Sequence, residues 1–253
     1  MNLKNKSVQT VVLGASNLSI ISMQDKLLDK PKNLIDVKGQ TILELAIQSY
    51  ALNQKMTNVV ILEEEEMAYE TSLYILRKFP DVTPRLITKQ TRGAMLSALL
   101  GLEGFDLEAP LVVAPGDSCF KADKQSIILA NFLNLMIGTD SDAGTVSFNS
   151  NLERWSYIVK DENAKIEQVV EKEVVSNIAT SGLFYFKTVK GFLDSSAWCL
   201  KHNINKNGVY YVSSTLNYMI SQQLKIVDYL IDFDDFCPLS STEDISLAQS
   251  AQI

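Results

Sequence analysis

Short apolar runs alternate with amphipathic segments along the first half of the chain. The runs are rich in β-branched residues and predict buried strands over residues 8–14, 58–62, 84–88 and 111–114. The segments between them have apolar residues at helical spacing and predict helices over residues 41–53, 66–78, 91–103 and 123–137. Thr41 and Glu44 have the spacing of a capping box, which marks the start of the first helix. This alternation with short connections predicts a mostly parallel sheet with helices on both faces.

The second half of the chain has a different pattern. Its strands are expected over residues 143–148, 156–160, 165–170, 183–187 and 225–230, and the turn at 161–164 makes a hairpin of the second and third. Helices are expected over residues 189–202, 211–223 and 242–248. Because the chain has no long linker, internal repeat or low-complexity tract, residues 1–253 are predicted to form a single α/β domain with a mixed sheet.

Composition narrows the range of functions. The chain has 253 residues and a net charge of −7, which argues against a nucleic-acid binder because phosphate contacts need a basic face. Its only histidine, His202, excludes sites with several His ligands. No apolar run is long enough to span a membrane. Three unpaired cysteines and no recognisable signal peptide predict a cytoplasmic protein with reduced thiols.

Two candidate sites lie near the ends of predicted strands. Gly116 and Asp117 follow the strand at 111–114, where α/β sheets bind ligands, and an aspartate there suits Mg²⁺ held together with substrate phosphates. An ordinary turn explains the same two residues. Lys32 follows Pro31 in a Lys-Pro-Lys sequence and could neutralise a phosphate, although this stretch by itself favours a solvated loop.

Two further candidates lie at a helix start and at a strand end. Gly93 begins the helix expected after residue 90, where backbone amides could meet an anion or a base edge. Glu171 and Lys172 end one strand opposite residues 180–182 and could hold sugar hydroxyls and a phosphate. The alternatives are an ordinary helix N-terminus and a surface charge pair of little energetic value. The acidic run at 63–66 is expected to be the solvated start of a helix.

Taken together and in order, these segments resemble the sugar-phosphate nucleotidyltransferase family, the NDP-sugar pyrophosphorylases. Residues 31–39 (PKNLIDVKG) resemble its P-K-x-L-x-x-V-x-G block, and residues 110–117 (PLVVAPGD) resemble its P-x-L-x-x-x-G-D strand. The other matching stretches are residues 92–100, 153–161, 169–172, 179–186 and 242–244. The likeness covers nearly the whole chain and is nearest to short members that serve capsule and lipopolysaccharide synthesis.

This resemblance implies a Rossmann-like three-layer nucleotidyltransferase fold with a mixed central sheet. Residues 1–140 would form the nucleotide-binding half and residues 141–253 the half that binds the sugar or another phosphorylated acceptor. In this family a sugar phosphate attacks the α-phosphorus of a nucleoside triphosphate, and pyrophosphate leaves. The implied catalytic residues are Lys32 and Asp117, the latter also as the Mg²⁺ ligand. The implied nucleotide-binding residues are Leu13, Gly14, Ala15, Gln90 and Gly93, and the implied acceptor-binding residues are Ser156, Glu171, Lys172 and Gly182.

The sequence departs from the family pattern in the Gly-rich loop after the first strand. The family has L-A-G-G-x-G-[TS]-R there, whereas this chain has Ser16 and Leu18 at glycine positions and Ile20 at the arginine position. Losing such a charged donor commonly costs about 3–4 kcal/mol of transition-state stabilisation. The second metal-binding aspartate of many relatives also falls near Pro238, where Asp234 or Asp235 could replace it only if the loop shifts.

Two hypotheses follow. The first, which the retained residues favour, is an active enzyme that uses Lys26, Lys30 or Arg92 in place of the missing arginine. The second is a non-catalytic relative that binds a nucleotide-sugar as a regulatory or partner subunit. A glycosyltransferase of the related fold is less favoured, because residues 116–118 carry only one aspartate and the Asp-x-Asp sequence at residues 140–142 lies in a predicted loop.

Overall fold

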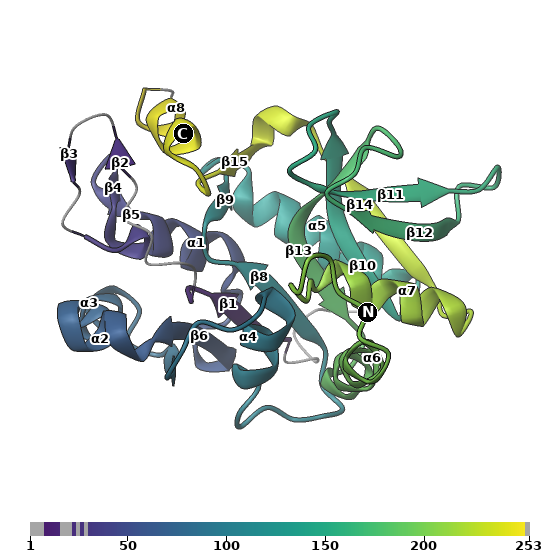
Figure 1. Cartoon of the computed structure of the whole chain (residues 1–253), viewed down its shortest axis with the longest axis horizontal. Helices are drawn as coiled ribbons and strands as arrows, with labels where there is room; N and C mark the ends of the chain where they lie inside the picture. The colour runs from purple at the N-terminus through teal and green to yellow at the C-terminus, as the bar shows by residue number, and fades with distance from the viewer. Residues whose placement is uncertain (1–7, 16–21, 24–25, 28–29, 251–253) are drawn as a thin grey trace.

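A computed structural model describes residues 8–15, 22–23, 26–27 and 30–250 of the chain. One mixed sheet of nine strands runs through the molecule, in the order β12-β11-β13-β8-β1-β6-β7, with β10 paired to β13 and β14 paired to β10 (Figure 1). These strands are β1 (Gln9–Leu13), β6 (Thr57–Leu62), β7 (Thr83–Ile87), β8 (Leu111–Pro115), β10 (Ala143–Asn149), β11 (Ser156–Lys160), β12 (Ile166–Glu171), β13 (Ile178–Phe186) and β14 (Ile226–Leu230). The predicted mixed α/β architecture is therefore confirmed.

The strand directions divide the sheet into two parts. Strands β8, β1, β6 and β7 are parallel, as the alternation of strands and helices predicts. Strand β13 runs antiparallel to β8 and to β10, and β11 and β12 form the expected antiparallel hairpin. Strand β13 pairs directly with β8, so the parallel and antiparallel parts of the sheet meet at this pair of strands.

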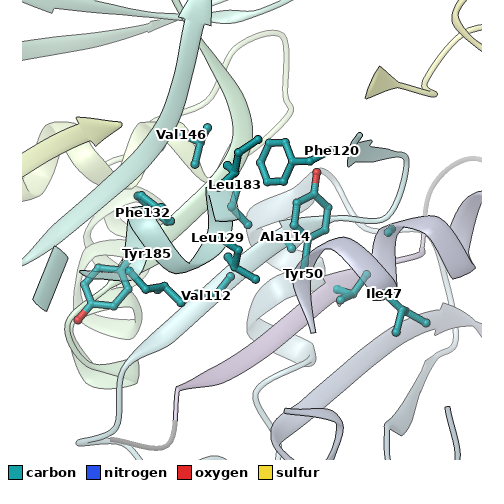
Figure 2. Packing of buried hydrophobic residues seen from close by; sticks show 14 of the residues in the cluster. Ile47, Tyr50, Val112, Ala114, Phe120, Leu129, Phe132, Val146, Leu183 and Tyr185 are labelled. Atoms are coloured by element: carbon teal, nitrogen blue, oxygen red, sulfur yellow. The ribbon is translucent and has the colours of Figure 1, made fainter. Parts of the chain in front are cut away.

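Helices cover both faces of the sheet. The helices are α1 (Ile42–Tyr50), α2 (Glu63–Tyr69), α3 (Thr71–Lys78), α4 (Ala94–Leu100), α5 (Gln125–Gly138), α6 (Val189–Lys201), α7 (Ser213–Ser221) and α8 (Thr242–Ser250). One core packs Ile47 and Tyr50 of α1 and Phe132 of α5 against Val112 and Tyr185 of the sheet (Figure 2). The opposite face is covered by α4, α6 and α7. This arrangement buries the central strands on both sides.

A third, smaller apolar cluster lies under α8. It joins Ile245 and Ala248 of α8 to Ile35, Ile42 and Cys119, and Figure 1 shows α8 beside two short strands, β9 (Ser118–Phe120) and β15 (Phe236–Pro238). The remaining short strands are β2 (Ser22–Met23), β3 (Lys26–Leu27), β4 (Asp36–Val37) and β5 (Gln40–Thr41), and the 3-10 turns are η2 (Lys32–Leu34), η3 (Gln54–Met56) and η4 (Phe233–Asp235). Packing of α8 therefore connects the C-terminal segment to the residue after η2 and to the start of α1.

Several element boundaries differ from the sequence prediction. The expected helix over 66–78 is two helices, α2 and α3, because Glu70 adopts a left-handed conformation with φ of 51°. The helix expected over 91–103 contains only residues 94–100. Strand β13 starts at Ile178, five residues before the predicted start, and β9 and β15 are not evident from the sequence pattern. The last two strands pair with each other across distant parts of the sequence, which no local pattern records. Among the described residues, no helix is both long and apolar enough to cross a membrane.

Candidate functional site

A cavity of about 610 Å³ opens where the parallel and antiparallel parts of the sheet meet. Its wall contains most of the residues that the sequence singles out: Leu13, Ala15, Gln90, Gly93, Asp117, Ser156, Glu171, Lys172 and Gly182. The remaining two, Lys32 and Gly14, do not line the cavity but contact residues that do. Lys32 pairs with Asp117, and Gly14 packs against Gly116. The structure therefore brings all of the predicted site residues into one place.

Asp117 and Lys32 form an ion pair at the carboxyl end of β8. The Lys32 Nζ atom donates a hydrogen bond to Oδ2 of Asp117. The lysine side chain is 11% exposed and the aspartate side chain is 28% exposed, so the carboxylate is the more accessible partner. A hydrogen bond of 2.8 Å from the Leu239 amide to the Asp117 carbonyl fixes the backbone beside it. Both charges therefore lie at the strand end where α/β sheets bind ligands.

A buried network behind this pair fixes the end of β1. The Nδ2 atom of Asn33 donates to the Gly14 carbonyl at 2.6 Å and to both carboxylate oxygens of Glu65, at 2.9 and 3.1 Å. Thr71 Oγ1 also donates to Glu65 at 2.9 Å. Burial raises the pKa of Glu65, whereas the hydrogen bonds from Asn33 and Thr71 oppose that rise. The acidic run at 63–66 is thus not a wholly solvated helix start, since Glu65 is 1% exposed.

Two glycines, Gly93 and Gly116, allow a close backbone approach in the cavity wall. Gly93 has φ of 122°, and a Cβ atom there would lie 2.3 Å from the Tyr210 carbonyl oxygen. Backbone hydrogen bonds from Tyr210 to Arg92 and from Met95 to Tyr210 hold the two segments together. A Cβ atom on Gly116 would lie 2.4 Å from the Leu13 carbonyl oxygen. Any side chain at either position would separate strands and loops that form the wall.

Glu171 and Lys172 lie on the opposite side of the cavity. Glu171 Oε2 accepts hydrogen bonds from Ser156 Oγ and from Ser213 Oγ, the latter at 2.7 Å. Lys172 has a left-handed backbone with φ of 49°, and its ammonium group lies over the ring of Tyr211 at 5.3 Å. This conformation turns the chain at the end of β12. A carboxylate and an ammonium group are therefore presented side by side to the cavity.

Comparison with solved structures identifies the fold. A nucleoside-diphosphate-sugar pyrophosphorylase from Vibrio cholerae superimposes with a TM-score of 0.80 at 19% identity, over 96% of this chain and 100% of that chain. A protein assigned as a glucose-1-phosphate thymidylyltransferase from Bacillus anthracis, solved in complex with sucrose, superimposes with a TM-score of 0.73 at 15% identity, over 97% and 95%. The chain has the nucleotidyltransferase fold. No protein-family model matches the sequence, and no curated protein matches it by sequence.

Arg154 is a residue of the cavity wall that the sequence prediction missed. Its guanidinium group pairs with both carboxylate oxygens of Asp244 at 2.8 and 2.5 Å, donates to Ser240 and lies 4.4 Å above the ring of Trp155. Burial alone would raise the pKa of Asp244, but hydrogen bonds from Arg154 and Ser241 outweigh it and lower the pKa. The sequence pointed to Arg154 only through its position in the E-R-W stretch at residues 153–155.

Not every candidate in the sequence reaches the cavity. Arg92 lines it, whereas Lys30 is exposed outside its wall. Pro238 pairs with Ser118 in the small sheet, and Asp234 lines a second cavity and not the main one. Ser16, Leu18 and Ile20 lie outside the described residues, as does the side chain of Lys26. Within the described part of the chain, no three His, Cys, Asp or Glu side chains cluster as metal ligands.

Proposed function

We propose that this chain is a nucleotidyltransferase that transfers a nucleoside monophosphate from a nucleoside triphosphate to a sugar phosphate, or to a similar phosphorylated acceptor. The observation that carries the proposal is the shared cavity, in which the Asp117–Lys32 pair lies opposite Glu171 and Lys172. Its fold, which is also that of a pyrophosphorylase and of a thymidylyltransferase, supports the same reaction class. A cytoplasmic role in supplying precursors of surface polysaccharides belongs to this proposal.

The reaction needs positioning and charge neutralisation more than covalent chemistry. An oxygen of the acceptor phosphate attacks the α-phosphorus of the nucleoside triphosphate. The bond from that phosphorus to the bridging oxygen breaks, and pyrophosphate leaves. Lys32 would exchange its contact with Asp117 for a contact with the transferred phosphate. Gln90 and the amides around Gly93 would hold the base, and residues 13–15 would hold the phosphates.

The acceptor would bind on the other side of the cavity. Glu171 is already oriented by two serine hydroxyls, so its free oxygen can accept hydrogen bonds from sugar hydroxyls. The ammonium group of Lys172 would hold the acceptor phosphate as a point charge. Gly182, with φ of 85°, leaves space beside Pro115 for the sugar ring. Residues from both halves of the chain would thus place the attacking oxygen in line with the bond between the α-phosphorus and the leaving pyrophosphate.

The residues present fit a magnesium ion that is held mainly by the substrate. Mg²⁺ in phosphoryl-transfer sites is commonly bound through one or two carboxylates together with phosphate oxygens and water. Asp117 supplies one accessible carboxylate at the cavity wall. A bound Mg²⁺ would neutralise charge on the phosphates and orient them. Removal of the metal by a chelator is therefore expected to abolish pyrophosphate release.

A non-catalytic, ligand-binding relative is the second candidate. It is favoured by the sequence after β1, where residues 16, 18 and 20 are Ser, Leu and Ile in place of the family's Gly, Gly and Arg. A leucine would crowd a phosphate backbone contact and an isoleucine supplies no charge. Arg92, which lines the cavity, is the described candidate for a replacement cation.

Pyrophosphate release separates these two functions. The protein would be incubated with Mg²⁺, with each common nucleoside triphosphate and dTTP, and with a panel of sugar 1-phosphates. We expect release with at least one pair. Asp117→Asn should remove it, whereas Asp123→Asn, an exposed aspartate nearby, should not. If no pair gives release but a nucleotide-sugar raises the melting temperature, the binding function replaces the enzymatic one.

A further inference from the structure

Cys119 and Cys237 lie directly opposite each other in the small sheet of β9 and β15. The strand register pairs Phe120 with Phe236, Cys119 with Cys237 and Ser118 with Pro238. Directly opposed residues of an antiparallel pair have Cα atoms about 4.5–5.5 Å apart and point to the same side of the sheet. That separation falls within the range of about 4.4–6.8 Å that a disulfide spans. Both thiols are free in this structure.

The two thiols differ in their access to solvent. Cys119 is 1% exposed, whereas Cys237 is half-buried and lines a second cavity of about 480 Å³ beside Trp155 and Lys121. A hydrogen bond from Cys119 lowers the pKa of Cys237, and Lys121 adds to this effect while burial and Asp244 oppose it. A solvent-accessible thiol with a second, buried thiol directly opposite it is the arrangement found at redox-active dithiols.

The third cysteine has none of these features. Cys199, on the inner face of α6, is fully buried in the core, and burial raises its pKa to about 11. It lies in a different apolar cluster from Cys119 and therefore has no cysteine partner within reach. Cys199 therefore serves as an internal control, a cysteine that is not expected to react with an oxidant.

We propose that Cys237 and Cys119 form a redox-active dithiol site whose oxidant is a low-molecular-weight disulfide of the glutathione type. The Cys237 sulfur attacks one sulfur of the oxidant, forming a mixed disulfide and releasing one thiol, which keeps the proton that Cys237 gives up. The Cys119 sulfur then attacks Cys237, and the second thiol leaves with the proton from Cys119. Two electrons pass from the two cysteines to the oxidant, so the oxidant's disulfide is exchanged for one in the protein.

The cross-link would act close to the main cavity. Strand β9 begins directly after Asp117, and the Leu239 amide just after β15 donates to the Asp117 carbonyl. The same segment continues to Ser240 and Asp244, which hold Arg154. A disulfide between Cys119 and Cys237 would therefore join β9, which follows Asp117, covalently to β15, which leads to the residues that hold Arg154. This inference does not depend on which reaction the main cavity performs.

Thiol mapping tests the proposal. The full-length protein would be reduced, desalted and incubated with oxidised glutathione, then denatured, alkylated and analysed by peptide mass spectrometry. We expect Cys199 to be the one alkylated cysteine and Cys119 to be joined to Cys237. Samples quenched early should carry glutathione on Cys237. The melting temperature of the cross-linked form should be higher than that of the reduced form.

Single substitutions assign the two roles. Cys119→Ser should leave a stable glutathione adduct on Cys237, and Cys237→Ser should leave Cys119 as unreactive as Cys199. Cys199→Ser should form the cross-link at the wild-type rate. The proposal is overturned if all three cysteines of the wild-type protein remain alkylated, or if glutathione first appears on Cys119 or Cys199. The early wild-type samples provide this test even if a serine at buried Cys119 prevents folding.

Discussion

At the scale of single residues, the site depends on groups that have no obvious role in the sequence. Glu65 is one of four consecutive glutamates, yet it alone of the four is buried, with hydrogen bonds from Asn33 and Thr71. Asn33 follows Lys32 directly and also holds the Gly14 carbonyl. Glu65 therefore positions both the lysine that pairs with Asp117 and the end of β1.

Glu65→Gln should lower kcat for nucleotidyl transfer by about ten-fold to a hundred-fold, because an amide nitrogen would face the Asn33 amide and displace Lys32. The nucleotide KM should change much less, since Gln90 and Gly93 remain in place. Steady-state kinetics would measure both constants. Glu64→Gln, an exposed neighbour in the same run, is the matched control and should resemble the wild type. Equal kinetics for the two variants would refute the positioning role.

Gly93→Ala should destabilise the fold by about 1–3 kcal/mol, because φ of 122° disfavours a side chain and the new Cβ would collide with Tyr210. Urea unfolding would measure the loss. Gly138→Ala is the control: a Cβ atom at the end of α5 has no atom within 4 Å, so alanine should stabilise by up to about 1 kcal/mol. A neutral result for Gly93→Ala would contradict the close approach to Tyr210.

At the scale of elements, short segments from distant parts of the sequence hold the cavity wall in place. Helix α8 packs over β9 and β15 through a small apolar cluster, and its Asp244 binds Arg154 from the turn before β11. Arg154 in turn lines the main cavity. The terminal helix is thus connected to the wall of the main cavity by one bidentate ion pair.

Arg154→Ala should destabilise the protein by about 2 kcal/mol at neutral pH, because Asp244 is 7% exposed and would lose its charged partner. Denaturant unfolding is the measurement. Lys190→Ala is the control, since it removes an exposed ion pair with Asp194 within α6 and should leave the stability nearly unchanged.

The same pair predicts a pH dependence. The folded protein lowers the pKa of Asp244, so its contribution to stability is present above the unfolded pKa of about 3.9 and is lost as the pH falls through the folded value. Unfolding free energies measured from neutral pH down to acid should therefore fall less steeply for Arg154→Ala than for the wild type. Parallel curves would show that Arg154 does not control the titration of Asp244.

At the scale of the whole molecule, the antiparallel junction of β8 and β13 decides where the cavity forms. Strand β8 ends at Pro115, two residues before Asp117, and β13 passes beside it with Ser181 and Gly182 in the cavity wall. One continuous sheet therefore carries the proposed nucleotide side and the proposed acceptor side. Each ligand should stabilise the fold through its own side.

A saturating nucleoside triphosphate or sugar phosphate, at about 100 times its Kd, should stabilise the protein by about 2.7 kcal/mol, which raises the melting temperature by roughly 5–10 °C. Glu171→Ala should abolish the shift with the sugar phosphate and keep the shift with the nucleotide, because Glu171 lies on the acceptor side. Glu162→Ala, in the exposed turn between β11 and β12, should keep both shifts. Loss of both shifts in Glu171→Ala would argue against two separate subsites.

The sequence by itself determined much of this protein. Local periodicity and capping residues such as Thr41 and Glu44 marked most helices and strands, and these elements are confirmed. The ordered motifs predicted the fold class, and the residues they marked share one cavity. Their catalytic roles remain predictions. Local sequence succeeds here because strand and helix periodicity, and residues at strand ends, are short-range properties.

Other features were decided only by the tertiary structure. Burial of Glu65 against Asn33 and the pairing of Arg154 with Asp244 both depend on partners distant in sequence. The opposition of Cys119 and Cys237 needs a register between strands separated by nearly half the chain. Such contacts leave no periodic pattern, because each follows from how whole elements pack and not from the residues next to it.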